Sequence, residues 1–326
     1  MTVPPPSPVP ADASDGDAYS YLGPSGTFTE AALAQVEDAR GKLWRSVNNV
    51  GEALADVVSG RSVAAMIAIE NTVEGGVTAT QDALAHVPNL RILGEYLVPV
   101  NFVLVGRPGT TLADVRTIHA HPVAYGQCRA WLDATLPSAG HIPATSNVAA
   151  AISLLPDPES GSLASIAEAA IAPPGIVDSY DVELLASGIE DNPNAVTRFV
   201  LVGRSSQLPA RTGADKTSVI VELPDDRAGG LLEMLEQFAT RGVNLTLIQS
   251  RPIGDALGRY RFVIDAEGHV HDERVADALL GLRRFSPRVT FLGSYPRADR
   301  APSTYRERYD DSVFLEARDW LRALLD

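Results

Sequence analysis

The sequence predicts an α/β region followed by a smaller α+β domain of the ferredoxin-like kind. Three observations predict this fold class. Strands alternate with helices to about residue 205, which indicates α/β architecture with mostly parallel pairing. Residues 206–215 are rich in Ser, Gln, Pro, Arg, Thr and Gly, which is typical of a linker. From residue 216 to 295 the order of elements is βαββαβ, the ferredoxin-like pattern.

Composition limits the function. The chain has 326 residues, 45% of them hydrophobic and 21% charged, and is long enough for two domains. A formal net charge of -14 would repel phosphates, so we expect no nucleic-acid partner and no anionic membrane. Cys128 is the single cysteine, which excludes an intrachain disulfide and favours a reducing compartment, the cytoplasm.

The first 18 residues, rich in Pro, are predicted to be a disordered tail. They have no basic start and no apolar run, so we expect neither a signal peptide nor a membrane anchor. We favour a flexible tail over a ligand for SH3-type domains. No other apolar stretch approaches the length of a membrane span.

Order is predicted to begin with a strand at 19–22, which runs into the glycine loop 23–26 and then a helix. Thr27 and Glu30 have the spacing of a capping box at the start of that helix. We expect the α/β region to extend over residues 19–205.

The same junction recurs twice. A buried strand at 63–69 leads through a loop into a helix from about Thr78, where Thr78 and Gln81 again have the capping spacing. Ser146 is the candidate N-cap of a third helix. Ligand sites of such sheets lie at the carboxyl ends of strands, so we expect the site in these loops.

The second domain is predicted to contain four strands (217–223, 243–251, 259–265 and 288–294) and two helices (229–240 and 272–284). A turn at 254–258 joins the two middle strands. Apolar residues of the first helix predict a core face, made of Leu231, Leu232, Leu235 and Phe238. The tail 296–326 contains an amphipathic helix, predicted to dock on the body or on a partner subunit.

Three loop-to-helix junctions can present backbone N–H groups to a ligand carboxylate. The pattern alone is weak, because many α/β proteins cap helices with Thr and Ser for stability only. A ligand site at these junctions and helix capping for stability alone therefore both stay open at this point.

Five motifs occur in the order of a known family. They are Tyr21–Phe28, Ile69–Val77, His121-Pro122 with Gln127-Cys128, Ser146–Ala150 and Asn194–Phe199. The chain resembles the prephenate dehydratase family from Tyr19 to Tyr295, and the Asn-x-x-Thr-Arg-Phe motif is the most specific part. The second domain similarly resembles an ACT regulatory domain, through Gln249–Pro252 and Gly229–Leu231.

The resemblance implies two lobes of the type-II periplasmic-binding-protein kind, with the active site in the cleft between them. It implies no metal and no organic cofactor. The expected reaction is the decarboxylating dehydration of prephenate to phenylpyruvate, with L-phenylalanine as allosteric effector. An open ferredoxin-like layer is expected to pair with another copy, which predicts a homodimer or a homotetramer.

The resemblance also implies the site residues. Thr197 is the predicted catalytic residue, hydrogen-bonding the leaving hydroxyl, and a β-branched strand residue is the alternative. The other predicted substrate contacts are Thr27, Asn71, Thr72, Gly75, Gly76, Gln127, Ser146, Asn147, Arg198 and Phe199. Arg198 could clamp a carboxylate or form a structural ion pair, and Asn71, Thr72 and Gln127 could instead fix loops.

The predicted effector site lies in the second domain. Its residues are Ala228, Gly229, Gly230, Leu231, Asn244, Leu245, Gln249, Ser250, Arg251 and Pro252. The loop before Gly229 opens into a helix N-terminus that suits a carboxylate.

The chain departs from the family pattern at several positions. Ala120 replaces a frequent Ser, Thr72 replaces a Ser, Gln249 replaces the usual Glu and Ala228 stands where Pro is common.

Other polar residues are interpreted as structural. Glu70 and Glu74 would face an anionic substrate and are expected to order their loop. The three histidines at 119, 121 and 141 have no metal-ligand spacing, and Cys128 is expected to be a buried apolar residue.

Two alternative functions remain open. An arogenate dehydratase would act on the amino acid analogue of prephenate. A non-catalytic amino-acid-sensing protein would keep the fold without turnover.

Overall fold

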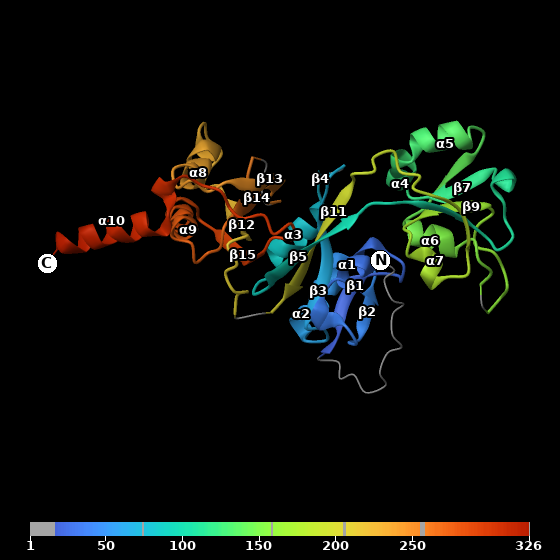
Figure 1. The fold of residues 1–326 in the computed structure, drawn as a ribbon, viewed down its shortest axis with the longest axis horizontal. Coiled ribbons are helices and arrows are strands. Elements are labelled where there is room, and N and C mark those ends of the chain that lie inside the picture. The colour runs from blue at the N-terminus through green and yellow to red at the C-terminus, as the bar shows by residue number, and fades with distance from the viewer. Residues whose placement is uncertain (1–16, 74, 158, 205–206, 255–257, 326) are drawn as a thin grey trace. The chain divides into compact units, whose positions relative to one another are not determined.

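The computed structural model describes residues 17–73, 75–157, 159–204, 207–254 and 258–325 (Figure 1). The chain divides into two compact units. One is Met1–Val77 with Tyr96–Phe199, and the other is Thr78–Glu95 with Val200–Asp326. The predicted disordered tail lies outside the described residues up to residue 16, as do Glu74 and part of the linker and of the 254–258 turn.

The first unit contributes strands to two sheets. One has the order β2-β1-β3-β11-β5, with β4 paired to β3. Its strands are β1 (Tyr19–Leu22), β2 (Trp44–Val47), β3 (Ala64–Asn71), β4 (Gly75–Gly76), β5 (Arg91–Pro99) and β11 (Val196–Gly203). Its helices are α1 (Phe28–Leu33) and α2 (Val50–Ser59), with a 3-10 turn at Glu37–Ala39.

The other sheet has the order β10-β6-β9-β7-β8. Its strands are β6 (Val103–Gly106), β7 (Thr117–Ala120), β8 (Gly140–Pro143), β9 (Ala169–Ala172) and β10 (Glu183–Ser187). The helices are α4 (Pro122–Gln127), α5 (Arg129–Thr135), α6 (Asn147–Ile152) and α7 (Ile176–Ser179), with a 3-10 turn at Leu112–Asp114.

Strand pairing is parallel where helices intervene. β1 runs parallel to β2 and β3, and β7 runs parallel to β8 and β9, as predicted. β6 differs, since it pairs antiparallel with both β9 and β10. The expectation of mostly parallel pairing is therefore confirmed around β1 and β7 and wrong for β6.

The sheet β10-β6-β9-β7-β8 is buried on both faces. Leu104 and Ile171 pack into one core cluster, while their strand neighbours Val103 and Val105 pack into another. Successive side chains of a strand point to opposite faces, so β6 and β9 need apolar residues at every position. This explains their continuous apolar sequence.

The second unit contains the ferredoxin-like domain, with all strand pairs antiparallel and the order β13-β14-β12-β15. Its elements are β12 (Asp215–Glu222), α8 (Gly230–Ala239), β13 (Leu245–Pro252), β14 (Tyr260–Glu267), α9 (Glu273–Phe285) and β15 (Val289–Pro296). The predicted order βαββαβ is confirmed.

The predicted core face of α8 is partly wrong. Leu231 and Leu232 are 42% and 59% exposed, whereas Met234 and Phe238 are buried. Gly230 is buried as well, so the inward face follows residues 230, 234 and 238. The sequence offers two apolar stripes on this helix, and packing against the sheet uses only one of them.

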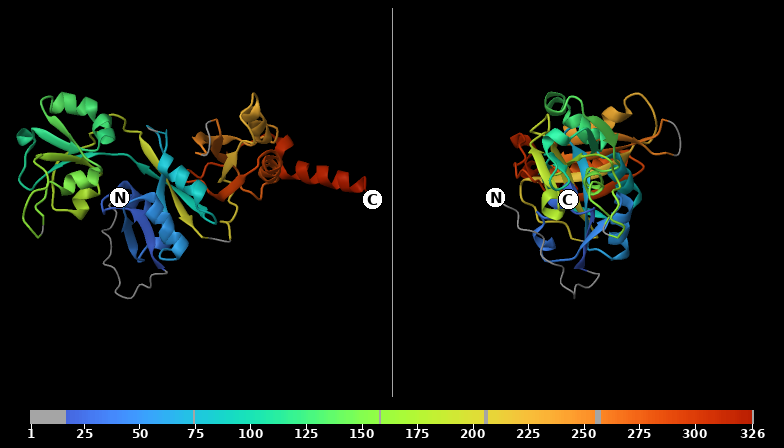
Figure 2. Two further views of the ribbon diagram at one scale, coloured as in Figure 1. Left: turned by 180° about the vertical axis from the view of Figure 1, so that it is seen from behind. Right: turned by 90° about the vertical axis from the view of Figure 1, so that its right-hand side faces the viewer.

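The C-terminal helix α10 (Asp311–Ala323) is where the sequence predicts it. The helix contacts the start of α9 twice: Asp311 accepts the N–H of Glu273 at 2.9 Å, and Arg318, in the middle of α10, pairs with the Glu273 carboxylate. Beyond that contact the helix projects away from α9, and Trp320 and Leu324 are exposed (Figure 2).

Helix α3 (Thr78–His86) and the first half of β5 belong to the second unit. Glu95 of β5 is almost fully buried; its carboxylate pairs with Lys216 of β12 at 3.0 Å and accepts the Ala298 N–H at 2.9 Å. Sequence order alone places these residues in the first region, because they lie between β3 and β6.

His269 is buried and neutral in the second unit. Its Nδ1 accepts the N–H of His271 at 3.1 Å, so Nε2 carries the proton and donates to the carbonyl of Pro209 at 3.2 Å. Burial lowers the pKa of the imidazole.

We therefore expect the free energy of unfolding to fall as the pH drops below about 6.5, because the unfolded histidine then binds more protons than the folded one. Urea unfolding of the wild-type chain and of His269→Gln, at pH 7.5 and 5.5, measures this. The substitution is expected to reduce the loss of stability between these pH values. An equal loss in both proteins would contradict the prediction.

Among the described residues, no helix combines the length and the apolar character needed to cross a membrane.

Candidate active site

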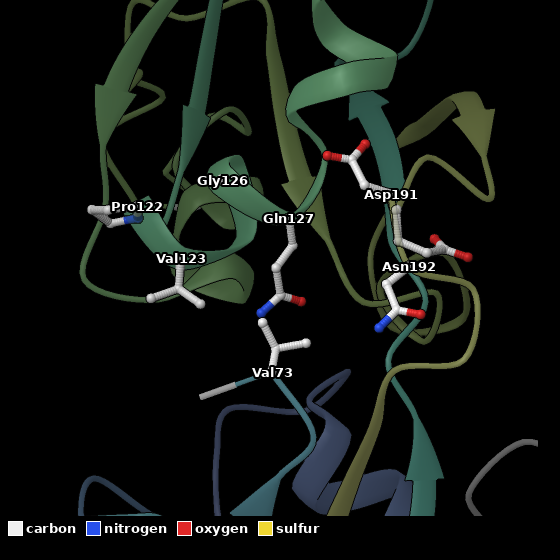
Figure 3. Close-up of a pocket in the computed structure, with 8 residues that line it drawn as sticks. Val73, Pro122, Val123, Gly126, Gln127, Asp191 and Asn192 are labelled. Atoms are coloured by element: carbon white, nitrogen blue, oxygen red, sulfur yellow. The ribbon is translucent and has the colours of Figure 1, made fainter. Parts of the chain in front are cut away.

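A cavity of about 430 Å³ opens in the first unit, within the size range of small-molecule sites. Its lining comes from the loop after β3, from α4 and from the segment before β11 (Figure 3). The lining residues are Val73, Pro122, Val123, Gly126, Gln127, Glu190, Asp191 and Asn192.

Gln127, a predicted substrate contact, ends α4 and points across the cavity toward Val73 (Figure 3). Its Oε1 is buried and makes no hydrogen bond within the described parts of the chain. A buried polar atom without a partner is costly, so this carbonyl is suited to accept a hydrogen bond from a ligand.

The segment Glu190–Asn192 was missed by sequence reasoning. The Asp191 carboxylate accepts the N–H groups of Ala130 and Trp131 at the start of α5, and its own N–H donates to the carbonyl of Gln127 at 2.7 Å. Glu190 accepts the Phe102 N–H at 2.8 Å. The available signal was position, since this acidic loop directly precedes the motif at Asn194–Phe199.

Asn71 and Thr197 form a hydrogen-bonded pair whose polarity is fixed. Asn71 Oδ1 accepts the backbone N–H of Val73 at 2.8 Å, which sets the orientation of the amide. Asn71 Nδ2 must then donate to Thr197 Oγ1, at 2.7 Å. Because Thr197 Oγ1 accepts this bond, its hydroxyl proton can be donated to a different acceptor. Val73 connects the pair to the cavity wall.

Thr72, Gly75 and Gly76 shape the loop beside this pair. The Thr72 N–H donates to the carbonyl of Val196 at 3.0 Å, and its hydroxyl accepts the Val196 N–H at 3.0 Å. Gly75 and Gly76 form β4, which pairs with β3, and Gly75 has φ +79, a conformation that favours glycine. Thr72 thus fixes the loop to β11. Loop fixation is the alternative to a substrate contact that the sequence leaves open for this residue.

Arg198 and Phe199 are both buried side chains of β11. Arg198 is buried, and its Nε donates to the Glu70 carboxylate at 2.9 Å, which is the structural ion pair that the sequence left open as the alternative to a carboxylate clamp. Phe199 is buried in β11, and its role as a substrate contact stays a prediction. Alternation along β11 explains both, because neighbouring side chains face the two covered sides of the sheet.

The helix junctions are capped by their own side chains. Thr27 caps α1 by accepting the Glu30 N–H at 3.2 Å, while the Glu30 carboxylate takes the Gly26 N–H at 2.6 Å. The reciprocal half of the predicted capping box therefore closes on Gly26. Ser146 caps α6 as predicted, and Asn147 Oδ1 accepts the His121 N–H at 3.1 Å. These groups do not line the cavity.

The prephenate dehydratase family profile matches residues 19–207. The chain belongs to the prephenate dehydratase family. The ACT domain profile matches residues 217–284, which lie in the ferredoxin-like domain.

Named relatives agree with this membership. The chain is 42% identical over 293 residues to the prephenate dehydratase of Mycolicibacterium vanbaalenii, covering 86% of this chain and 91% of that protein. It is 40% identical over 306 residues to that of Amycolatopsis methanolica, covering 94% and 97%. A crystal structure of the Arthrobacter aurescens prephenate dehydratase in complex with L-Phe superposes with a TM-score of 0.88, at 51% identity and covering 94% and 99%.

In this member of the prephenate dehydratase family, the histidines at 119, 121 and 141 and the cysteine have structural roles. His121 caps α4 by accepting the Val123 N–H, and His141 stacks on Tyr125 with ring centroids 4.0 Å apart. Burial lowers the pKa of His119, and Nδ1 lies 2.9 Å from the Ser153 hydroxyl. Burial also raises the pKa of the Cys128 thiol well above its ordinary range, so it stays neutral.

Eight of the ten predicted effector residues fall into two groups in the ACT domain, while Gly230 is buried and Leu245 is half-buried. Gly229 has φ +85 and precedes α8, and Ala228, Leu231, Asn244, Ser250 and Pro252 are exposed. Gln249 and Arg251 instead contact α3. Gln249 accepts from Gln81 Nε2, and Arg251 donates to Asp82 from Nε at 3.2 Å and from Nη2 at 2.6 Å. Gln81 Oε1 is buried and accepts no hydrogen bond within the described residues, so Gln81 does not complete the capping box that its spacing from Thr78 predicts.

Proposed function

We propose that this chain converts prephenate to phenylpyruvate, with release of carbon dioxide and water. The observation that carries the proposal is the Thr197–Asn71–Val73 chain of hydrogen bonds, of which Val73 lines the cavity, in a member of this family. In this chain Asn71 donates to the Thr197 oxygen, so the Thr197 hydroxyl proton is not used in the bond between the two residues.

The chemistry needs little more than a donor and a defined pose. Loss of the ring carboxylate and the para hydroxyl produces an aromatic ring, which drives the reaction. A Thr hydroxyl is a poor acid, so Thr197 acts by a hydrogen bond that strengthens as the C–O bond breaks. Asn71 holds the hydroxyl in the donating orientation.

Substrate contacts are proposed for Gln127 and for backbone N–H groups near Gly75, Gly76, Thr27 and the start of α6. Gln127 has the clearest support, because its buried Oε1 faces the cavity. Ser146 and Asn147 support the site by holding α6.

We further propose that L-phenylalanine inhibits the reaction by binding the ACT domain, at Gly229–Leu231 and Asn244–Leu245. The relative from Arthrobacter aurescens was solved with L-Phe. The exposed apolar residues Leu231 and Ile248 favour a pairing of ACT domains in a homodimer or homotetramer. The single buried cysteine favours the cytoplasm.

Arogenate is the second candidate substrate. The observation that favours it is the pair of carboxylates, Glu190 and Asp191, in the cavity wall. Arogenate carries an ammonium group where prephenate carries a keto group, and carboxylates stabilise an ammonium.

The test is turnover by the purified chain without added metal or nucleotide. We expect phenylpyruvate from prephenate at neutral pH, read by its absorbance in alkali, and a higher kcat/KM for prephenate than for arogenate. Added L-phenylalanine is expected to lower the rate. A rate no greater than that of the spontaneous reaction would refute the catalytic proposal, and a rate unchanged at millimolar L-phenylalanine would refute the regulatory one.

A further inference from the structure

Helix α3 joins the loop of Asn71 to the ACT domain. The helix begins at Thr78, directly after Val77, whose N–H donates to the carbonyl of Ile69 at 2.9 Å. The loop between them contains Asn71, Thr72 and the short strand β4. The first turn of α3 is therefore directly continuous in sequence with this loop.

Two arginines of the ACT domain hold one carboxylate of α3. Arg251 of β13 binds Asp82 through Nε and Nη2, and Arg261 of β14 donates to the same carboxylate from Nη2 at 2.8 Å. A carboxylate held by three charge-assisted bonds from two strands has little freedom to rotate or slide. The bonds from Arg251 also lower the pKa of Asp82, so the carboxylate stays charged at neutral pH.

The neighbouring contact is buried. Gln81 has no exposed surface, and its Nε2 donates to Gln249 of β13. Arg261 is buried as well. Removing the partner of a buried polar group costs more free energy than removing the partner of an exposed one. These contacts therefore favour one position of α3 against β13 and β14.

We infer that Gln249, Arg251 and Arg261 are positioning residues, which hold α3 and through it the loop 71–77. This inference rests on the proposed function for its link to the reaction. It assigns Gln249 and Arg251 a different role from the effector contacts that the sequence predicts. They connect the domain that would bind the effector to the loop that orients Thr197.

The chain offers a matched control for this contact. Arg241 of α8 pairs with Asp277 of α9 in the same domain, and their side chains are 16% and 35% exposed. The side chains of Arg251 and Asp82 are 22% and 37% exposed. The two pairs have the same chemistry and similar exposure, but only the second pair involves α3.

The experiment compares Asp82→Asn, Asp82→Glu and Asp277→Asn with the wild-type chain. Hydrogen–deuterium exchange is read at the amides of Thr72, Val73 and Val77, which are hydrogen-bonded in the loop. We expect about tenfold faster exchange in Asp82→Asn, partial rescue in Asp82→Glu, and no change in Asp277→Asn. Equal exchange in Asp82→Asn and Asp277→Asn would overturn the inference, and this readout does not depend on activity.

Kinetics and binding separate positioning from effector contact. We expect Asp82→Asn to lower kcat/KM about tenfold and to reduce the fractional inhibition by L-phenylalanine, while calorimetry gives a Kd for L-phenylalanine within about threefold of wild type. Arg251→Met is expected to behave in the same way, and the double variant to add little, because both changes remove one contact. A loss of binding in Arg251→Met with normal kcat/KM would show an effector contact and overturn the inference. Absence of wild-type turnover would refute the proposed function, leaving the exchange result to decide the positioning role.

Discussion

Replacement of Thr197 by alanine is expected to lower kcat by about 100-fold or more, with little change in the melting temperature. The reason is the loss of a donor whose hydrogen bond strengthens mainly in the transition state. Thr197 lies beside Asn71, which donates to its hydroxyl oxygen and leaves the hydroxyl proton for the leaving group. Steady-state kinetics with prephenate measures the effect.

Thr197→Ser is the matched variant, because serine keeps the hydroxyl and loses only a methyl group. It is expected to retain kcat within about tenfold of wild type. If the alanine variant kept kcat within about threefold of wild type, Thr197 would not act on the leaving group, whatever the change in KM.

Lys216→Ala is expected to cause the largest loss of stability, about 3 to 5 kcal/mol in the free energy of unfolding. Lys216 and Glu95 are 12% and 3% exposed, so the substitution removes a cation that pairs with a buried carboxylate. Chemical denaturation monitored by circular dichroism measures the loss.

The comparison is Lys42→Ala, which removes the partner of Asp17 in an exposed pair. These side chains are 41% and 54% exposed, and the expected loss is about 0 to 1 kcal/mol. Similar losses in the two variants would show that burial of Glu95 does not govern the strength of its ion pair.

The element order could be predicted from sequence because local signals act within a few residues. The N-caps Thr27 and Ser146 bond to N–H groups three residues ahead, and the alternation of strands and helices is periodic. The family motifs also pointed to Asn71 and Thr197, which lie 126 positions apart and form a hydrogen bond.

Contacts between distant segments could not be predicted in this way. Leu231 and Met234 are both apolar residues of α8, and only packing decides which of them faces the sheet. The ion pair of Arg198 could not be predicted without knowing that Glu70 of β3 lies next to it in the folded chain. Asp191 gave no periodic signal, because it stabilises the start of α5 from a loop about 60 residues away.

The grouping of α3 and β5 with the ACT domain limits how such proteins can be recombined. A chimaera joined at about residue 206 would give Glu95 and Asp82 a foreign ACT domain, without Lys216, Arg251 and Arg261 as partners. Because the loss of partners for buried charges is costly, the junction that best preserves folding includes residues 78–95 from the same parent as the ACT domain. The unit of exchange in this protein is therefore discontinuous in sequence.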